Sequence, residues 1–141
     1  MRFTRGTDYG TRGMIYLAGK PQESVILVSD IASAVNLPTS YMAMIFQELA
    51  KEGIVHSHRG AHGGFSLARP ASLITLRQII EAIGGPIALN RCLSASEGCE
   101  NSGTCPMHPV FARAQGQLVG VLDQTTLYDL VAQGGELGAY V

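Results

Sequence analysis

The strongest constraint on the fold of this chain is a loop-forming stretch that holds all of its cysteines. Cysteines stand at positions 92, 99 and 105 and a histidine at 108, which gives the spacing C-x6-C-x5-C-x2-H. The residues between them are rich in glycine, serine and asparagine, which favour turns over helices and strands. Because the stretch has little apolar surface to bury, we expect metal coordination by thiolates to hold it together.

The residues alone leave the chemistry of this stretch open. Cys92, Cys99, Cys105 and His108 make a Cys3His set, which would bind zinc as a structural staple. An iron–sulfur cluster also takes three or four thiolates and accepts another ligand type at a replaced position. A metal-free redox switch needs one oxidised thiolate and a second thiolate to resolve it. Three incidental thiols are the least favoured interpretation, because the chain has no cysteine elsewhere.

The length and composition predict one domain, or one domain with a substantial extension. The chain has 141 residues and 46% hydrophobic content, which is enough for a packed core. It does not open like a signal peptide, and no run reaches the roughly 18 apolar residues that a membrane span needs. We therefore expect a cytoplasmic protein, a setting in which clustered cysteines more often bind metal or sense redox state than form disulfides.

A mild charge asymmetry divides the chain. Residues 1–69 contain seven Lys and Arg against five Asp and Glu, a net charge of +2. Residues 70–141 contain three against six, a net charge of −3. The first part is the one expected to face a nucleic acid.

The first 84 residues predict a winged helix-turn-helix DNA-binding domain. The expected elements are helices at 7–18 with Thr7 as its cap, at 29–35, and at about 40–52 with Thr39 or Ser40 as its cap, and short strands at 25–28, 54–57 and 64–68. In the third helix, residues 42, 45, 46 and 49 follow the spacing of a buried face. Two helices joined by a tight turn and followed by a basic, glycine-rich hairpin have the order of a winged helix.

The outward face of the third helix and the hairpin turn carry the candidate DNA contacts. Positions 40, 43, 44 and 47 point away from the buried face, so Ser40 and Gln47 are placed to read base edges in a major groove. Thr39 and Tyr41 are candidates for phosphate contacts. At the wing, Arg59 suits a minor groove, and Gly60 allows close approach to the backbone. The alternative is a solvated helix face and an ordinary hairpin.

The second half predicts a connecting helix, the cysteine loop and a dimerisation segment. Thr75 and Gln78 form a capping-box pattern that opens an apolar helix ending near residue 84. After the loop at 85–108, a helix at about 109–122 repeats apolar residues on one side, at positions 111, 114, 118, 121 and 122. Such a stripe can be buried against a second copy, giving a twofold dimer that matches a pseudo-palindromic operator. Residues 126–131 predict a short capped last helix within the final segment, 109–141.

Several motifs together resemble the Rrf-type family of winged-helix iron–sulfur transcription regulators. They are the opening Met-Arg-Phe-Thr-Arg-Gly-Thr-Asp-Tyr-Gly-Thr-Arg, the wing Arg-Gly-Ala-His-Gly-Gly-Phe-Ser-Leu from residue 59, Pro-Ala at 70–71, Ile-Ile-Glu-Ala at 79–82, the three cysteines, and Thr-Leu-Tyr-Asp-Leu-Val at 126–131. The resemblance covers nearly the whole chain. It implies a homodimer with one cluster per subunit, held by Cys92, Cys99 and Cys105, whose state controls DNA affinity.

The same resemblance implies two candidates for the fourth cluster ligand. In IscR-like regulators of cluster assembly, a histidine shortly after the third cysteine completes a [2Fe-2S] centre, and His108 matches it. In NsrR-like nitric-oxide sensors, an aspartate of the first helix, supplied by the partner subunit, completes a [4Fe-4S] centre, and Asp8 matches it. The opening stretch favours Asp8 slightly. The plain alternatives are a helix-terminal charge for Asp8 and a capping or solvated role for His108.

The sequence therefore predicts a mainly α protein with a small β-hairpin wing that acts as an iron–sulfur-dependent regulator. It is expected to be a homodimeric repressor that answers nitric oxide, redox state or iron–sulfur supply. The alternative is a zinc-stapled nucleic-acid-binding or interaction module without a sensing role. An enzyme is not expected, because no histidine and acid pair is placed around an activated thiol and no cofactor-binding glycine motif is present.

Overall fold

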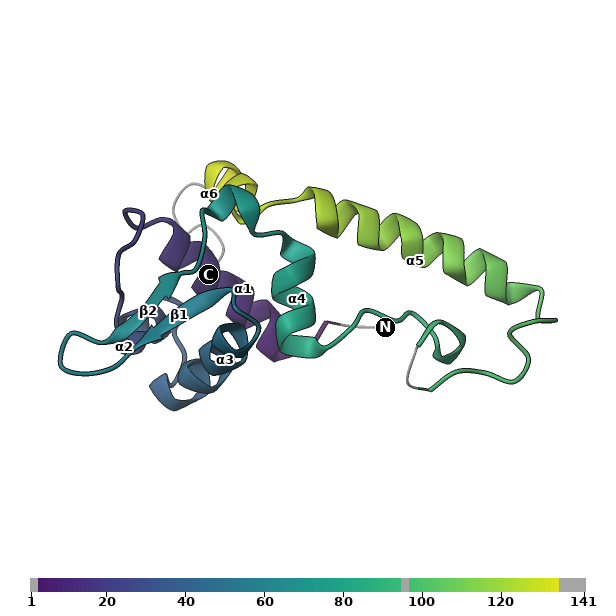
Figure 1. Cartoon of the computed structure of the whole chain (residues 1–141), viewed down its shortest axis with the longest axis horizontal. Helices are drawn as coiled ribbons and strands as arrows, with labels where there is room; N and C mark the ends of the chain where they lie inside the picture. The colour runs from purple at the N-terminus through teal and green to yellow at the C-terminus, as the bar shows by residue number, and fades with distance from the viewer. Residues whose placement is uncertain (1–2, 95–96, 135–141) are drawn as a thin grey trace.

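The computed structural model describes residues 3–94 and 97–134, and these residues form a mainly helical fold with one hairpin, as expected (Figure 1). The elements are α1 (Arg5–Ala18), α2 (Val28–Ala34), α3 (Thr39–Lys51), β1 (Val55–His58), β2 (Gly64–Leu67), η1 (Ala71–Leu73), α4 (Leu76–Gly84), η2 (Arg91–Leu93), α5 (Met107–Gln124) and α6 (Leu127–Gly134). The first two residues of the opening motif, two loop residues (95–96) and the end of the expected dimerisation segment (135–141) lie outside the described residues.

The elements divide into a globular part and an arm. The globular part contains α1 to α4, the hairpin and α6, around a core whose largest fully buried side chains are Phe46, Met14, Ile31, Met42, Leu49, Ile74, Ile79, Leu127 and Val55. The arm, residues 85–124, consists of the cysteine loop and α5, and it extends away from the wing (Figure 1). Among the described residues, no helix is both long and apolar enough to cross a membrane.

Helix α1 begins earlier than expected and packs unusually closely. Thr4, not Thr7, is the N-cap: its Oγ1 accepts a hydrogen bond from the backbone N–H of Thr7 over 3.1 Å. The prediction of Thr7 as the cap was wrong, because Thr7 is buried inside the first turn of the helix. Gly10 and Gly13 face other helices, and a Cβ on Gly13 would lie 2.9 Å from Cε2 of Phe46. These glycines let α1 approach the core.

The segment before α3 departs from the prediction in two places. The strand expected at 25–28 is reduced to one bridge, in which Ile26 exchanges two backbone hydrogen bonds of 2.9 Å with Phe65. Helix α2 already starts at Val28, with Asp30 in its first turn where a negative charge complements the helix dipole. The predicted cap of α3 was also wrong: Pro38 occupies the N-cap position, and no side-chain cap is made there.

The hairpin and α3 otherwise match the expected winged helix-turn-helix. The four residues predicted to face the core from α3 (42, 45, 46 and 49) are all buried. Gly53 ends the helix region with a φ of 75°, a left-handed conformation that glycine adopts without steric cost. The strands pair antiparallel with Val55 opposite Leu67 and His58 opposite Gly64.

Helix α4 leads from the globular part into the arm, and the chain returns from the arm to the globular part at α6. The predicted capping box is present, with Thr75 and Gln78 bonded reciprocally. The residues that follow α5 are bonded to the segment that begins α4. The backbone N–H of Leu76 donates to Thr125 O, and the N–H of Leu127 donates to Ile74 O, each over 2.8 Å. These bonds return the chain to the start of α4, so both ends of the arm are anchored in the globular part.

Candidate metal centre and nucleic-acid interface

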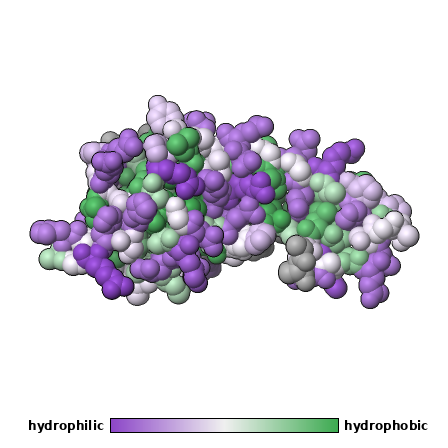
Figure 2. Space-filling view, in the orientation of Figure 1, coloured by the Kyte–Doolittle hydropathy of each residue, from purple (hydrophilic) through white to green (hydrophobic). Residues whose placement is uncertain are grey.

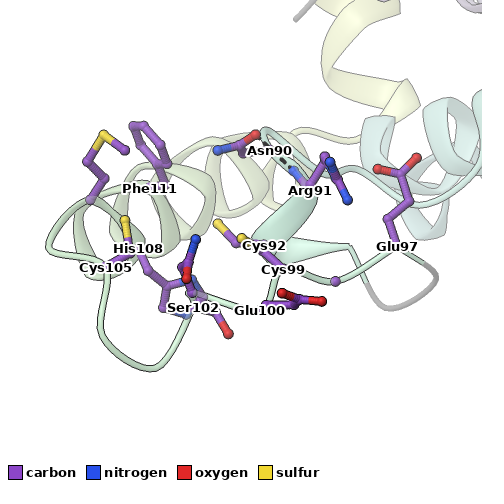
Figure 3. Close-up of a pocket in the computed structure, with 13 residues that line it drawn as sticks. Asn90, Arg91, Cys92, Glu97, Cys99, Glu100, Ser102, Cys105, His108 and Phe111 are labelled. Atoms are coloured by element: carbon purple, nitrogen blue, oxygen red, sulfur yellow. Dashed lines mark hydrogen bonds between the residues drawn. The ribbon is translucent and has the colours of Figure 1, made fainter.

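The three cysteines and His108 line one cavity of about 760 Å³ between the loop and the start of α5 (Figure 3). Cys92 belongs to η2, Cys99 and Cys105 lie in the irregular loop that follows, and His108 belongs to the first turn of α5. The other lining residues are Asn90, Arg91, Glu97, Gly98, Glu100, Asn101, Ser102, Met107 and Phe111. The structure thus brings together the four residues that the sequence singled out within this stretch.

Backbone turns and side-chain hydrogen bonds shape the loop around this cavity. Asn90 caps η2: its Oδ1 accepts a 2.9 Å hydrogen bond from the backbone N–H of Arg91, the residue before Cys92. The N–H of Cys105 donates to Asn101 O over 2.7 Å. Gln115 of α5 accepts a 2.8 Å hydrogen bond from the N–H of Leu89. The loop is held mainly by polar bonds, in agreement with its small apolar content.

The thiols surround the cavity without converging on one point. All three cysteines are free; Cys99 is exposed, and Cys92 and Cys105 are half-buried. Within residues 3–94 and 97–134, no three side chains of His, Cys, Asp or Glu are close enough to hold a single metal ion. A zinc ion needs four ligands around one centre. An iron–sulfur cluster presents different iron atoms to different thiolates, so its ligands need not meet at a point. Thiolates and an imidazole are donor types that both centres take.

The imidazole of His108 supplies an independent sign of a ligand. Its Nδ1 is the one buried side-chain nitrogen or oxygen, within the described part of the chain, that has no hydrogen-bond partner. Burying such a group without a partner costs about 1–3 kcal/mol. Coordination by Nδ1 would remove this cost. The residue as a whole is half-buried, and Nδ1 is its ring atom without a partner.

Asp8 lies outside this cavity. It sits in the first turn of α1, its side chain is 57% exposed, and it pairs with Arg12 over 3.4 Å between Oδ1 and Nε. It lines a separate apolar groove with Phe3, Ile80 and Leu122. One chain therefore brings His108, but not Asp8, to its own thiols.

The candidate DNA-reading face of α3 is open to solvent. Thr39, Ser40 and Gln47 are exposed, and Met44 between them is 59% exposed. Tyr41 is half-buried, with its ring edge-on to that of Tyr9 at a centroid distance of 6.3 Å. Tyr41 therefore supports the packing of α1 on α3 and has less freedom to reach phosphate than the sequence suggested.

The wing presents one permanent cation at an exposed turn. Arg59 and Gly60 are both exposed, and Gly60 has a φ of 99° with open space where a Cβ would be. His58 precedes them, and its Nε2 lies 2.8 Å from Oγ of Ser66 in the opposite strand. The hairpin is further fixed because Gly64 lies against the backbone of Ile26.

A polar network links the arm to the globular part. Glu81 of α4 accepts a 3.1 Å bond from the N–H of Ile87 at the start of the arm, and its other oxygen lies 2.7 Å from Nε of Arg77. Arg77 also lies 3.7 Å from Asp123 at the end of α5. Sequence reasoning missed the roles of Glu81 and Gln115. For Glu81, the sequence signal that could have indicated a role was a charged residue within the apolar pattern of α4. Gln115 had no such signal.

Comparisons with known proteins agree with this arrangement. Residues 3–133 match the family Rrf2, described as an iron-dependent transcriptional regulator. Rv1287 of Mycobacterium tuberculosis, which carries the name of an HTH-type transcriptional regulator, is 30% identical over 100% of this chain and 86% of its own length.

Two solved structures are similar along most of their length. CymR of B. subtilis, a global cysteine regulator, has a TM-score of 0.76 and 31% identity, covering 94% of this chain and 98% of its own. IscR of T. potens has a TM-score of 0.75 and 26% identity, covering 96% and 90%. These relatives are transcriptional regulators and not enzymes. This chain belongs to the Rrf2 family of winged-helix transcriptional regulators.

Proposed function

We propose that this regulator binds operator DNA as a homodimer and that an iron–sulfur cluster in the arm controls its affinity. The observation that carries the proposal is the single cavity lined by Cys92, Cys99, Cys105 and a buried, unpartnered Nδ1 of His108. The family's description as iron-dependent supports iron over zinc. In this proposal, residues 1–84 bind DNA, 85–108 hold the cluster and 109–141 form the dimer.

His108 and Asp8 are the two proposed fourth ligands. The unpartnered Nδ1 supports His108, which implies a [2Fe-2S] centre. Asp8 would reach the thiols only from the partner subunit, because within one chain it lies in another groove; this arrangement implies a [4Fe-4S] centre. Imidazole is known to replace thiolate in some clusters, and the resemblance to NsrR-like regulators implies the carboxylate.

The exposed surface of α5 supports the homodimer. Of its 18 residues, all within the described part of the chain, only Leu122 is buried. Val110 is 53% exposed and Val121 63% exposed, and Phe111 and Leu118 are half-buried. Apolar surface gathers over this part of the molecule (Figure 2). Pairing with a second α5 buries this surface, and twofold symmetry places two copies of α3 on two half-sites of DNA.

The chain's own bonds provide a route from the arm to the DNA-binding elements. A bound cluster would cross-link the three thiol-bearing points of the loop. The loop entrance is bonded to Glu81 of α4, and α4 packs against both α1 and α3. A change in the loop therefore reaches the helix that presents Ser40 and Gln47. In a dimer, a small displacement of α3 changes the spacing between the two copies of this helix. The affinity for an operator with two half-sites therefore changes as well. On this basis we propose repression relieved by nitric oxide, oxidation or loss of the cluster.

The test is purification without oxygen, followed by a visible spectrum, iron and sulfide assays, and DNA binding before and after nitric oxide. We expect a coloured protein with iron and sulfide, and a changed operator affinity after treatment. A colourless protein with stoichiometric zinc would overturn the cluster. His108→Ala and Asp8→Ala, tested singly, separate the fourth ligands: the variant that alters the spectrum identifies the residue.

A second candidate mechanism is a metal-free thiol switch. The exposed, free thiol of Cys99 favours it, because accessible thiolates oxidise first and a second cysteine can resolve them. Mass spectrometry of metal-free protein after peroxide treatment tests it. A disulfide between Cys99 and another loop cysteine, together with altered DNA binding, would support this mechanism.

A further inference from the structure

Met44 is a large apolar side chain left exposed on the second helix of the helix-turn-helix. It is 59% exposed, whereas Met14 and Met42 are fully buried. Ser40 stands one turn before it and Gln47 one turn after it, and both are exposed. The outward face of α3 therefore presents a polar, an apolar and a polar side chain in succession.

We infer that Met44 selects thymine in the operator, through contact between its thioether side chain and the C5-methyl group of that base. The inference rests on the proposed DNA-binding role of α3 and names a base that this helix reads. In the major groove, thymine is the base that offers a methyl group, and apolar side chains contact it. An unbranched methionine adapts its shape to such a target.

The size of the apolar surface argues against a protein partner at this position. On α3, which is described completely, Met44 is the one large hydrophobic side chain classed as exposed. A stable protein interface buries about 800 Å² on each partner, far more than one methionine offers. A single methyl group in a groove is a target of matching size.

The two charges beside Met44 suit different parts of DNA, Glu48 a base edge and Arg5 a phosphate. Met44 lines a groove together with Thr4, Arg5, Gly6, Tyr41, Ile45, Glu48 and Ile83. Glu48 is exposed one turn after Met44; its carboxylate is repelled by phosphate but accepts a hydrogen bond from cytosine N4. Arg5, at the start of α1, is exposed and lines the same groove, and its cation suits a phosphate.

The helix geometry also predicts where the thymine lies. With a rise of about 1.5 Å per residue, Met44 is about 6 Å along the axis from Ser40 and about 4.5 Å from Gln47. Base pairs are stacked about 3.4 Å apart. The thymine is therefore expected one to two base pairs from the positions that Ser40 and Gln47 contact.

The experiment starts from operator sequences selected out of random duplex DNA by the full-length protein. Each thymine of the selected half-site is then replaced by deoxyuridine, which removes only the methyl group. At one position per half-site, we expect this to weaken wild-type binding about three- to fourfold, the effect of one buried methyl group. Met44→Ala should show no such loss, and Met44→Leu, which stays apolar, should retain it.

Leu73→Ala serves as the matched control, because Leu73 is 61% exposed on η1, away from α3. It should respond to deoxyuridine as the wild type does. If no deoxyuridine substitution weakens wild-type binding, or if Met44→Ala keeps the full sensitivity, the inference is wrong. If the wild-type protein selects no DNA sequence at all, both the inference and the proposed function are overturned; a sequence-specific wild type without methyl sensitivity overturns the inference alone.

Discussion

The side-chain oxygen of Gln115 accepts a hydrogen bond from the backbone N–H of Leu89 over 2.8 Å, across 26 residues of sequence. This bond fastens the chain entering the cysteine loop to the helix that leaves it. The position of Cys92, three residues after Leu89, depends on that attachment.

Replacing Gln115 by Ala should loosen the loop. A hydrogen bond of this kind contributes about 0.5–1.5 kcal/mol, so the Leu89 amide should exchange with deuterium roughly 2- to 13-fold faster. Hydrogen exchange of metal-free protein measures this directly. Gln117→Ala, two residues further along α5 and exposed, should leave the Leu89 amide unchanged; equal effects of both variants would contradict the role of Gln115.

Glu81→Ala should uncouple the arm from α4. The variant loses the bond from Ile87 and the ion pair with Arg77, which should lower the free energy of unfolding by about 1–2 kcal/mol. Urea unfolding measures this loss. The ratio of DNA affinities with and without the cluster should also fall toward one. Glu52→Ala, exposed at the end of α3, is the control and should leave that ratio intact.

Gly10→Ala should destabilise the protein even though alanine favours helix. A Cβ at this position collides with Ile83 and lies 2.8 Å from Ile45. Overpacking of this kind costs about 1–3 kcal/mol, more than the roughly 1 kcal/mol that helix propensity returns. Gly6→Ala, in the same helix with contacts of 3.6 Å and beyond, should be neutral or stabilising. Thermal unfolding of the two variants decides between packing and propensity.

Val121→Glu should weaken the dimer. Its side chain is 63% exposed in one chain, so a charge costs little in the monomer but is desolvated in the proposed α5 interface. We expect the dimer dissociation constant to rise at least about tenfold, equivalent to 1.4 kcal/mol. Sedimentation equilibrium measures it. Leu73→Glu, on η1, should leave dimerisation unaffected.

Arg59→Ala should reduce DNA affinity and the dependence of that affinity on salt. Arg59 is an exposed cation at the wing, and a phosphate or minor-groove contact there adds to the salt dependence of binding. The slope of log K against log salt should become less steep by about one for each wing that contacts DNA. A change in sequence preference with an unaltered slope would show that Arg59 reads bases instead.

The sequence predicted the elements where a periodic pattern controls the structure. The buried face of α3, the capping box of Thr75 and the β1–β2 hairpin were confirmed because each depends on nearby residues. The prediction of a strand at 25–28 was wrong because only Ile26 pairs with Phe65, and α2 begins two residues later, at Val28. The caps of α1 and α3 were misplaced because several hydroxyl residues compete at each start.

The candidate site was predicted in composition but not in its connections. The spacing of the thiols and His108 indicated a shared centre, and the structure brings all four to one cavity. The roles of Glu81 and Gln115 could not be predicted, because each depends on a contact with backbone that is fixed only when the arm folds back. Asp8 illustrates the same limit: its proposed partner thiols belong to another chain.

Leu127, where the chain re-enters the globular part after α5, determines when the core can be completed during synthesis. Leu127 is fully buried in the core, and its N–H is bonded to Ile74, which was made more than fifty residues earlier. A ribosome producing this chain completes the cysteine loop and α5 before it adds this last piece of the core. The cysteine loop is thus made while the globular part still lacks Leu127, and that part completes its core only after the loop exists.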